Sequence, residues 1–89
     1  MANHPSAEKR NRQRIKRTLR NRGVRSAVRT AIRKARTALA SGDPSSAAPA
    51  VRAASIALAK AAAKRVVHPR AASRTTSRLM SQLHQLSAG

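Results

Sequence analysis

The sequence predicts an all-α protein, a three-helix bundle in which a basic first helix is extended and overhangs the other two. Turn-forming residues at Pro5, at 42–44 and at 68–69 divide the 89 residues into three long segments. Each segment is rich in Ala, Arg, Lys, Leu and Gln, which are good helix formers, and none alternates β-branched residues as a strand would. The short connections favour antiparallel neighbours. The length allows a single domain over residues 1–89.

The first predicted helix covers about residues 6–41. Ser6 is suited to cap its start, and Glu8 falls in the first turn, where a negative charge is favourable beside the helix dipole. Gly42, directly after the last turn, is typical of a helix end. At 1.5 Å per residue this helix is a rod of roughly 50 Å. It is longer than the other two predicted helices, so part of it must extend beyond them.

The two halves of the first helix differ in their side chains. In the second half, apolar residues recur at helical spacing with arginines opposite them, which is the pattern of an amphipathic core helix. In the first half, basic residues point in nearly every direction, and Ile15 and Leu19 project away from the later apolar stripe. We therefore expect the second half to pack and the first half to overhang. The predicted stripe is Val24, Val28, Ala31, Ile32, Ala35 and Leu39.

The second predicted helix covers about residues 44–65. Asp43 is a preferred N-cap residue, and Pro44 suits the first helical position. Pro49 lies too deep for the first turn, so we expect either a kink there or a helix start nearer Ser45. One face of this helix is apolar and is expected to pack in the bundle. It comprises Ala47, Val51, Ala54, Leu58, Ala61 and Ala62.

The third predicted helix covers about residues 69–87, and His68 is expected to cap it or to position the turn that leads into it. A ladder of Arg70, Arg74 and Arg78 recurs at i, i+4 spacing on the side away from the apolar stripe. Such a ladder is either a solvated face or a row of phosphate contacts, and beside a basic first helix the second interpretation is better. The apolar stripe is Ala72, Thr76, Leu79, Leu83 and Leu86.

The composition excludes most classes of function. Lys and Arg number 20 against two acidic residues, so the net charge is +18. Both acids are expected at helix starts and there is no Gly-rich phosphate loop, so we expect no enzyme, no cofactor and no small-molecule substrate. The histidines are far apart in the sequence, so no metal site is expected. The absence of Cys excludes a Cys-based zinc site, and the absence of aromatic residues excludes stacking of bases on rings. A polycation of this kind has a polyanion as its natural partner.

The basic run in the first helix is the strongest functional signal. A charge run is usually a solvated face, but a solvated face needs no charge on every side, and few acids are available here as counter-charges. A rod that is basic all round is suited to lie among phosphates, where each neutralised phosphate releases a counterion. The candidate residues are Lys9, Arg10, Arg12, Arg14, Lys16, Arg17, Arg20 and Arg22.

Four stretches show a specific order of residues that an Ala- and Arg-rich composition would not by itself produce. They are MANHPSAEKRNRQ at the start, LRNRGVRSAVRTAIRK in the first helix, SGD before the Ala-rich helix, and VVHPRAASRTTSRL at the entry to the third. Over about residues 1–86 this order resembles the bacterial ribosomal protein S20 family of the small subunit. The most specific positions are Ser6, Ala7, Lys9, Arg10, Arg25, Ser26, Arg29, Thr30, His68, Arg74, Ser77, Arg78 and Leu79.

The resemblance implies a cytoplasmic protein of the ribosome, without catalytic activity or cofactor, buried in the 16S ribosomal RNA of the small ribosomal subunit. It implies direct binding to the 5′ domain and a contact with the long penultimate helix. Arg65 and Arg70 stand where the family usually has Gly and Asn. Carried over by position, the implied RNA-binding residues are Lys9, Arg10, Arg14, Arg17, Arg25, Ser26, Arg29, Thr30, His68, Arg74, Ser77 and Arg78.

Two other classes of function share the positive charge. A nucleoid-type DNA-compacting protein would more often show Pro/Lys/Ala repeats or a dimer core, and the sequence has neither. A membrane-active cationic helix would need an unbroken bulky apolar face opposite its charges, which the first half of the first helix lacks. No apolar run approaches the roughly 18 residues of a membrane span, so no membrane partner is expected.

Overall fold

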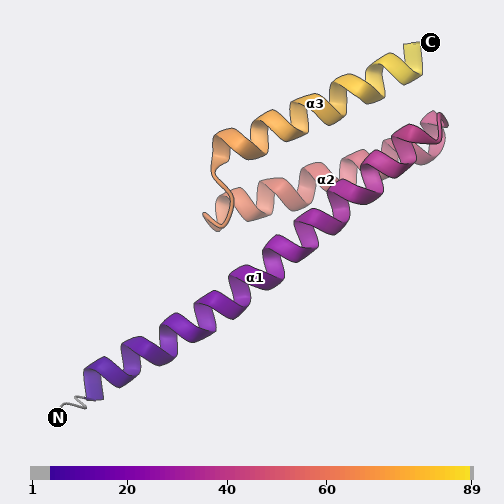
Figure 1. Cartoon of the computed structure of the whole chain (residues 1–89). Helices are drawn as coiled ribbons and strands as arrows, with labels where there is room; N and C mark the ends of the chain where they lie inside the picture. The colour runs from indigo at the N-terminus through magenta and orange to yellow at the C-terminus, as the bar shows by residue number, and fades with distance from the viewer. Residues whose placement is uncertain (1–4, 89) are drawn as a thin grey trace.

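Three α-helices make up most of residues 5–88, the part of the chain that the computed structural model describes (Figure 1). They are α1 (Pro5–Ala40), α2 (Pro44–Ala63) and α3 (Pro69–Ala88). No strand occurs within residues 5–88. The all-α three-helix bundle predicted from the sequence is therefore confirmed.

The first helix extends far beyond the other two. Figure 1 shows the N-terminal part of α1 projecting away from α2 and α3, and the molecule measures 67 × 20 × 14 Å along its principal axes. Every side chain from residue 6 to residue 20 is exposed. The predicted overhang is confirmed, and Ile15 and Leu19 lie on it with 51% and 59% of their surface exposed.

The core is small and lies along α2, which packs against both α1 and α3. One cluster joins Val28 of α1, Leu58 and Ala61 of α2 and Ala72 of α3. A second cluster also contains residues from all three helices. It joins Ala35 of α1, Val51 and Ala54 of α2 and Leu79 of α3. The predicted apolar stripes thus face the core. Alanine supplies many of these positions, so the helices pack closely but bury little apolar surface per residue.

The start of α1 differs by one residue from the prediction. The helix begins at Pro5, so Ser6 lies inside its first turn and is not the N-cap. Proline suits the first position of a helix because its φ is preset and its missing N–H would have no helical partner there. Glu8 lies in the first turn, as expected. At the other end α1 stops at Ala40, one residue before the predicted boundary.

The turn between α1 and α2 follows the predicted capping chemistry. Gly42 has φ +82°, a conformation that glycine adopts at no steric cost, and its N–H donates to the Leu39 carbonyl at 3.2 Å. The carboxylate of Asp43 accepts hydrogen bonds from the backbone N–H of Ser45 at 3.0 Å and from its hydroxyl at 2.8 Å. Asp43 is therefore the N-cap of α2, and Pro44 is its first residue.

Pro49 does not delay or divide α2. The helix begins at Pro44, so the alternative of a start nearer Ser45 is wrong, and it continues through Pro49 to Ala63. Proline removes one hydrogen bond of the helical ladder. The loss is tolerated because residues on both sides of Pro49, Ala47 and Val51, are buried in the bundle and hold the helix in place.

The end of α2 comes two residues earlier than predicted. Lys64 is the C-cap, and Arg65 follows with φ +59°. The Arg65 N–H donates to the Ala62 carbonyl at 3.0 Å, and the Val66 N–H donates to the Ala61 carbonyl at 2.9 Å. This pair of bonds is a Schellman motif, in which the residue after the cap is usually glycine. Arg65 thus occupies a left-handed position that disfavours a side chain.

Candidate nucleic-acid interface

Every one of the predicted RNA-binding side chains is exposed. They fall into three groups on the molecule, two on α1 and one at the start of α3. The first group, on the overhang, is Lys9, Arg10, Arg12, Arg14, Lys16, Arg17, Arg20 and Arg22. The second group, on the packed half of α1, is Arg25, Ser26, Arg29 and Thr30. The third group is His68, Arg70, Arg74, Ser77 and Arg78.

The three groups do not converge on one patch. The first two follow each other along α1, whereas the third lies on α3, which packs mainly on α2 and little on α1. In Figure 1, α2 lies between the other two helices over much of the bundle. The charges are therefore spread over separate faces of an elongated body. Such a distribution suits a partner that surrounds the protein better than a partner with a single flat surface.

On α1, Thr30 has a defined hydrogen bond. Its hydroxyl donates to the Ser26 backbone carbonyl one turn earlier, at 3.0 Å. A hydroxyl has one hydrogen to donate and two lone pairs that accept. Because the donor is used within the helix, the exposed oxygen of Thr30 faces solvent as an acceptor.

His68 caps α3 through its imidazole ring. The Nδ1 atom accepts a hydrogen bond from the backbone N–H of Arg70 at 3.1 Å, which satisfies one of the free N–H groups at the start of the helix. An accepting Nδ1 places the ring proton on Nε2. The side chain is exposed, so the cap also holds an N–H donor at the surface. The expectation that His68 caps or positions this turn is confirmed.

The two acidic residues offset little of the positive charge. Hydrogen bonds from the hydroxyl and then the backbone N–H of Ser45 hold the pKa of Asp43 below its ordinary value of 3.8, so this carboxylate is charged but engaged in the cap. Glu8 lies at the far end of the overhang, in the first turn of α1. Residues 9–42 contain no acidic residue, and neither α2 nor α3 contains one.

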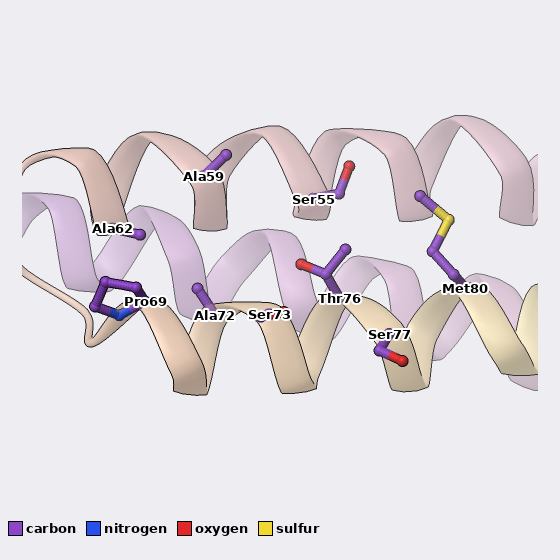
Figure 2. A pocket seen from close by; sticks show the side chains of 9 residues that line it. All are labelled: Ser55, Ala59, Ala62, Pro69, Ala72, Ser73, Thr76, Ser77 and Met80. Atoms are coloured by element: carbon purple, nitrogen blue, oxygen red, sulfur yellow. The ribbon is translucent and has the colours of Figure 1, made fainter.

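A groove between α2 and α3 is lined by small and hydroxyl-bearing residues (Figure 2). Thr76 and Met80 extend from α3 toward α2, and Ser77 is the one predicted RNA-binding residue among those that line it. None of its lining side chains is Asp, Glu, His, Lys or Arg. The groove therefore offers shape and hydroxyl groups but no acid–base pair.

Neither a metal-ligand cluster nor a membrane-spanning helix occurs in residues 5–88. Among residues 5–88, no three His, Cys, Asp or Glu side chains lie together as metal ligands would. Within the same part of the chain, no helix combines the length and the apolar character needed to cross a bilayer.

Two adjoining hollows, which periodicity did not predict, follow the seam between α1 and α2. Lys34 lines one of them, and Lys60 and Lys64 line the other; none of the three was among the predicted binding residues. Each lysine is exposed and ordinary in its helical context, so the sequence alone does not distinguish it from a solvated charge. Only the packing of the two helices places the three side chains along one seam.

Fold and surface together define a small helical polycation, a protein with a small apolar core and a net charge of +18. A model of the ribosomal protein S20 family matches residues 2–84. The chain is 55% identical over 87 residues to small ribosomal subunit protein bS20 of Sorangium cellulosum, covering 98% of this chain and 92% of that protein. It therefore belongs to the ribosomal protein S20 family, and it is a ribosomal protein and not an enzyme.

Two other relatives agree with this assignment. Small ribosomal subunit protein bS20 of Maridesulfovibrio salexigens is 46% identical over 86 residues, which cover 97% of this chain and 99% of the relative. The protein of the same name from an Anaeromyxobacter species is 56% identical over 79 residues, covering 89% and 88%. The resemblance found in the sequence motifs is thus confirmed over nearly the whole chain.

Proposed function

We propose that the chain is a structural component of the small ribosomal subunit that binds 16S rRNA directly. In this proposal the whole of residues 1–89 acts as one RNA-binding domain and bridges phosphates of the 5′ domain and of the long penultimate helix. The observation that carries the proposal is the overhang of α1, because residues 6–20 are exposed on all sides and include seven basic side chains. Family membership and the names of the relatives support the ribosomal setting.

The mechanism is electrostatic bridging. RNA strands that approach one another repel through their phosphates, and a thin rod with charge on every side can lie between them and neutralise both. Arg outnumbers Lys in this chain, and its planar guanidinium donates two parallel hydrogen bonds to one phosphate. Each phosphate contact also releases counterions, which makes binding steeply dependent on salt.

Recognition is expected to depend on the shape of the folded RNA. Helical RNA has a deep, narrow major groove that side chains cannot read, and a shallow minor groove that exposes 2′-hydroxyl groups. The protein has no aromatic residue on which an unstacked base could lie. The three groups of basic and hydroxyl residues, from Lys9 to Arg78, therefore act as contacts to phosphate and ribose, placed by the lengths and directions of the helices.

Chemical footprinting of 16S rRNA with and without the protein tests this proposal. We expect protection in two regions, one in the 5′ domain and one in the penultimate helix, and preference for the folded rRNA over duplex DNA of equal length. If the protein protected only one of these two rRNA regions, the proposal that it bridges them would be wrong. Equal affinity for duplex DNA would favour the alternative, a nucleoid-type DNA-compacting protein.

A further inference from the structure

We infer that the seam between α1 and α2 is a second RNA-binding surface, a groove that holds one sugar-phosphate strand of the rRNA between three lysines. We call it the α1–α2 groove. It consists of two adjoining hollows that share Ala27 of α1 and Ala53 of α2. The inference rests on the proposed function and adds to it a contact surface on α2, a helix to which neither the charge run nor the resemblance assigned any RNA contact.

The floor of the groove is mainly apolar, and alanine is its commonest residue. Ala27 and Ala31 supply it from α1, and Ala50, Ala53 and Ala57 supply it from α2, with the larger Val24, Val28 and Ile56 beside them in one of the two hollows. Alanine side chains let another backbone approach the helices closely. Ala27 and Ala53 are both exposed, so the floor is open to solvent in the free protein. A ribose ring, which presents carbon-bound hydrogens on its face, fits such a floor without leaving a buried polar group unpaired.

The edges of the groove carry charge of one sign. Lys34 lies on the α1 side, and Lys60 and Lys64 lie on the α2 side. All three are exposed, and no acidic residue lines the groove. A lysine ammonium on a flexible stem binds phosphate as a point charge. A strand that follows the floor would thus place its phosphates near ammonium groups on both edges.

Hydroxyl groups of α1 line the same groove and fit RNA in particular. Ser26 and Thr30 are among its lining residues. Thr30 already donates to the Ser26 carbonyl, so its oxygen is an acceptor for an incoming donor. The 2′-hydroxyl of a ribose can donate such a bond, and DNA has no equivalent group.

The groove suits an RNA strand better than a helix from a neighbouring protein. A docking helix usually inserts large apolar side chains as anchors, whereas the hollow lined by Ser26, Thr30 and Lys34 has no large apolar side chain to pack against them. The groove also continues around α1 from the predicted RNA-binding residues Ser26 and Thr30. One RNA surface can therefore extend from the overhang along α1 and onto α2.

Two pairs of matched variants test the inference by binding to 16S rRNA. Lys60→Gln removes a groove charge, and Arg52→Gln removes an exposed charge of α2 that does not line the groove. We expect Lys60→Gln to lower the slope of log K against log salt by roughly 0.7–0.9, the value of one phosphate contact, and Arg52→Gln to leave it unchanged. The double variant Lys60→Gln/Lys64→Gln should lower it by about twice as much.

The second pair changes shape without changing charge. Ala53→Leu fills the floor, whereas Ala48→Leu adds the same side chain at an exposed position of α2 outside the groove. Both should fold, since leucine is a good helix former, and circular dichroism checks this. We expect Ala53→Leu to weaken rRNA binding by roughly tenfold, which corresponds to about 1.4 kcal/mol, and Ala48→Leu to bind like the unmodified protein.

The experiments can contradict the groove alone or both the groove and the proposed function. If the unmodified protein binds rRNA while Lys60→Gln and Ala53→Leu behave like their controls, the α1–α2 groove holds no RNA and the proposed function stands. That result is also expected if an acidic helix of another protein occupies the groove. If the unmodified protein does not bind rRNA, both the proposed function and the groove are wrong.

Discussion

His68 Nδ1 accepts the backbone N–H of Arg70 at 3.1 Å, so one imidazole closes the start of α3 and leaves its Nε2–H at the surface. Asn, Asp, Ser and Thr are the usual residues at this position. The imidazole of His68 makes the same kind of capping hydrogen bond, and its ring extends further from the helix than the side chains of those four residues. Arg70 begins the ladder that continues through Arg74 and Arg78, so the cap also fixes where that ladder starts.

We expect His68→Ala to destabilise the protein by about 0.5–1 kcal/mol, the lower part of the range for losing an N-cap. His68→Asn should restore this stability, because its side-chain oxygen can accept the same N–H. Urea unfolding followed by circular dichroism measures both. The two variants then separate capping from contact, since His68→Asn should still bind rRNA more weakly if the Nε2–H donates to a phosphate. Equal stability of His68→Ala and the unmodified protein would contradict the capping role.

Arg65→Gly should raise the stability of the free protein by up to about 1 kcal/mol. Arg65 has φ +59°, and a left-handed conformation costs a residue with a side chain roughly 1–2 kcal/mol. The greater freedom of glycine in the unfolded chain offsets part of the gain. Thermal unfolding provides the measurement. Lys64→Gly is the matched control, because Lys64 has an ordinary helical φ of −84°, and this change should not stabilise.

Replacing Arg70, Arg74 and Arg78 together by Gln should weaken rRNA binding and leave the helix content nearly unchanged. All three side chains are exposed. If each contacts one phosphate, the slope of log K against log salt should fall by about 2–3. The triple Lys variant keeps the charge and should keep most of the slope. An unchanged affinity of the Gln variant would show that the ladder is only a solvated face.

The buried faces of the helices could be predicted from the sequence, because periodicity determines which side chains share a face. Val28, Val51 and Leu79 are all buried as predicted. The end of α2 could not be predicted in this way. A Schellman motif is expected at a glycine, and nothing in the local sequence marks Arg65 as its left-handed residue.

The interface was predicted less completely than the fold. Charge density along α1 singles out the overhang, because basic residues there occupy every side of one helix. Lys34 lies on α1, Lys60 on α2 and Lys64 at the C-cap of α2, and they line one seam only because the two helices pack. Helical periodicity contains no information about the neighbour across a seam, so such a groove becomes visible only in the structure.

The stability of α2 should decrease in acid through the titration of Asp43. Hydrogen bonds from Ser45 lower the pKa of this carboxyl below 3.8 in the folded protein. Its contribution to stability is therefore fully present above the pKa of the unfolded chain and is lost as the pH falls through the folded value. We expect a constant melting temperature near neutral pH and a decrease below about pH 4. Asp43→Asn keeps an accepting oxygen without a titrating group, so its melting temperature should fall less over the same range.

The last prediction concerns the overhang in the free protein. Residues 6–20 are exposed, and Ile15 and Leu19 belong to neither core cluster. Basic residues at i, i+4, such as Lys16 and Arg20, repel one another and destabilise an isolated helix. Gly23 adds a weak point at the junction, which costs roughly 1 kcal/mol relative to alanine. Little besides its own hydrogen bonds therefore holds this part of α1 helical.

We therefore expect residues 6–22 to fray in free solution and to become firmly helical on rRNA, which supplies the counter-charge and a surface for Ile15 and Leu19. Amide hydrogen exchange should show fast exchange over residues 10–20 without RNA and strong protection with it, while Val28 to Leu39 remain protected in both states. Gly23→Ala should slow the exchange in the free protein, because an added Cβ meets no atom within 4 Å and alanine favours the helix. Strong protection of residues 10–20 without RNA would show that the overhang is stable by itself. The RNA would then bind a preformed rod, and no ordering of residues 6–22 would accompany binding.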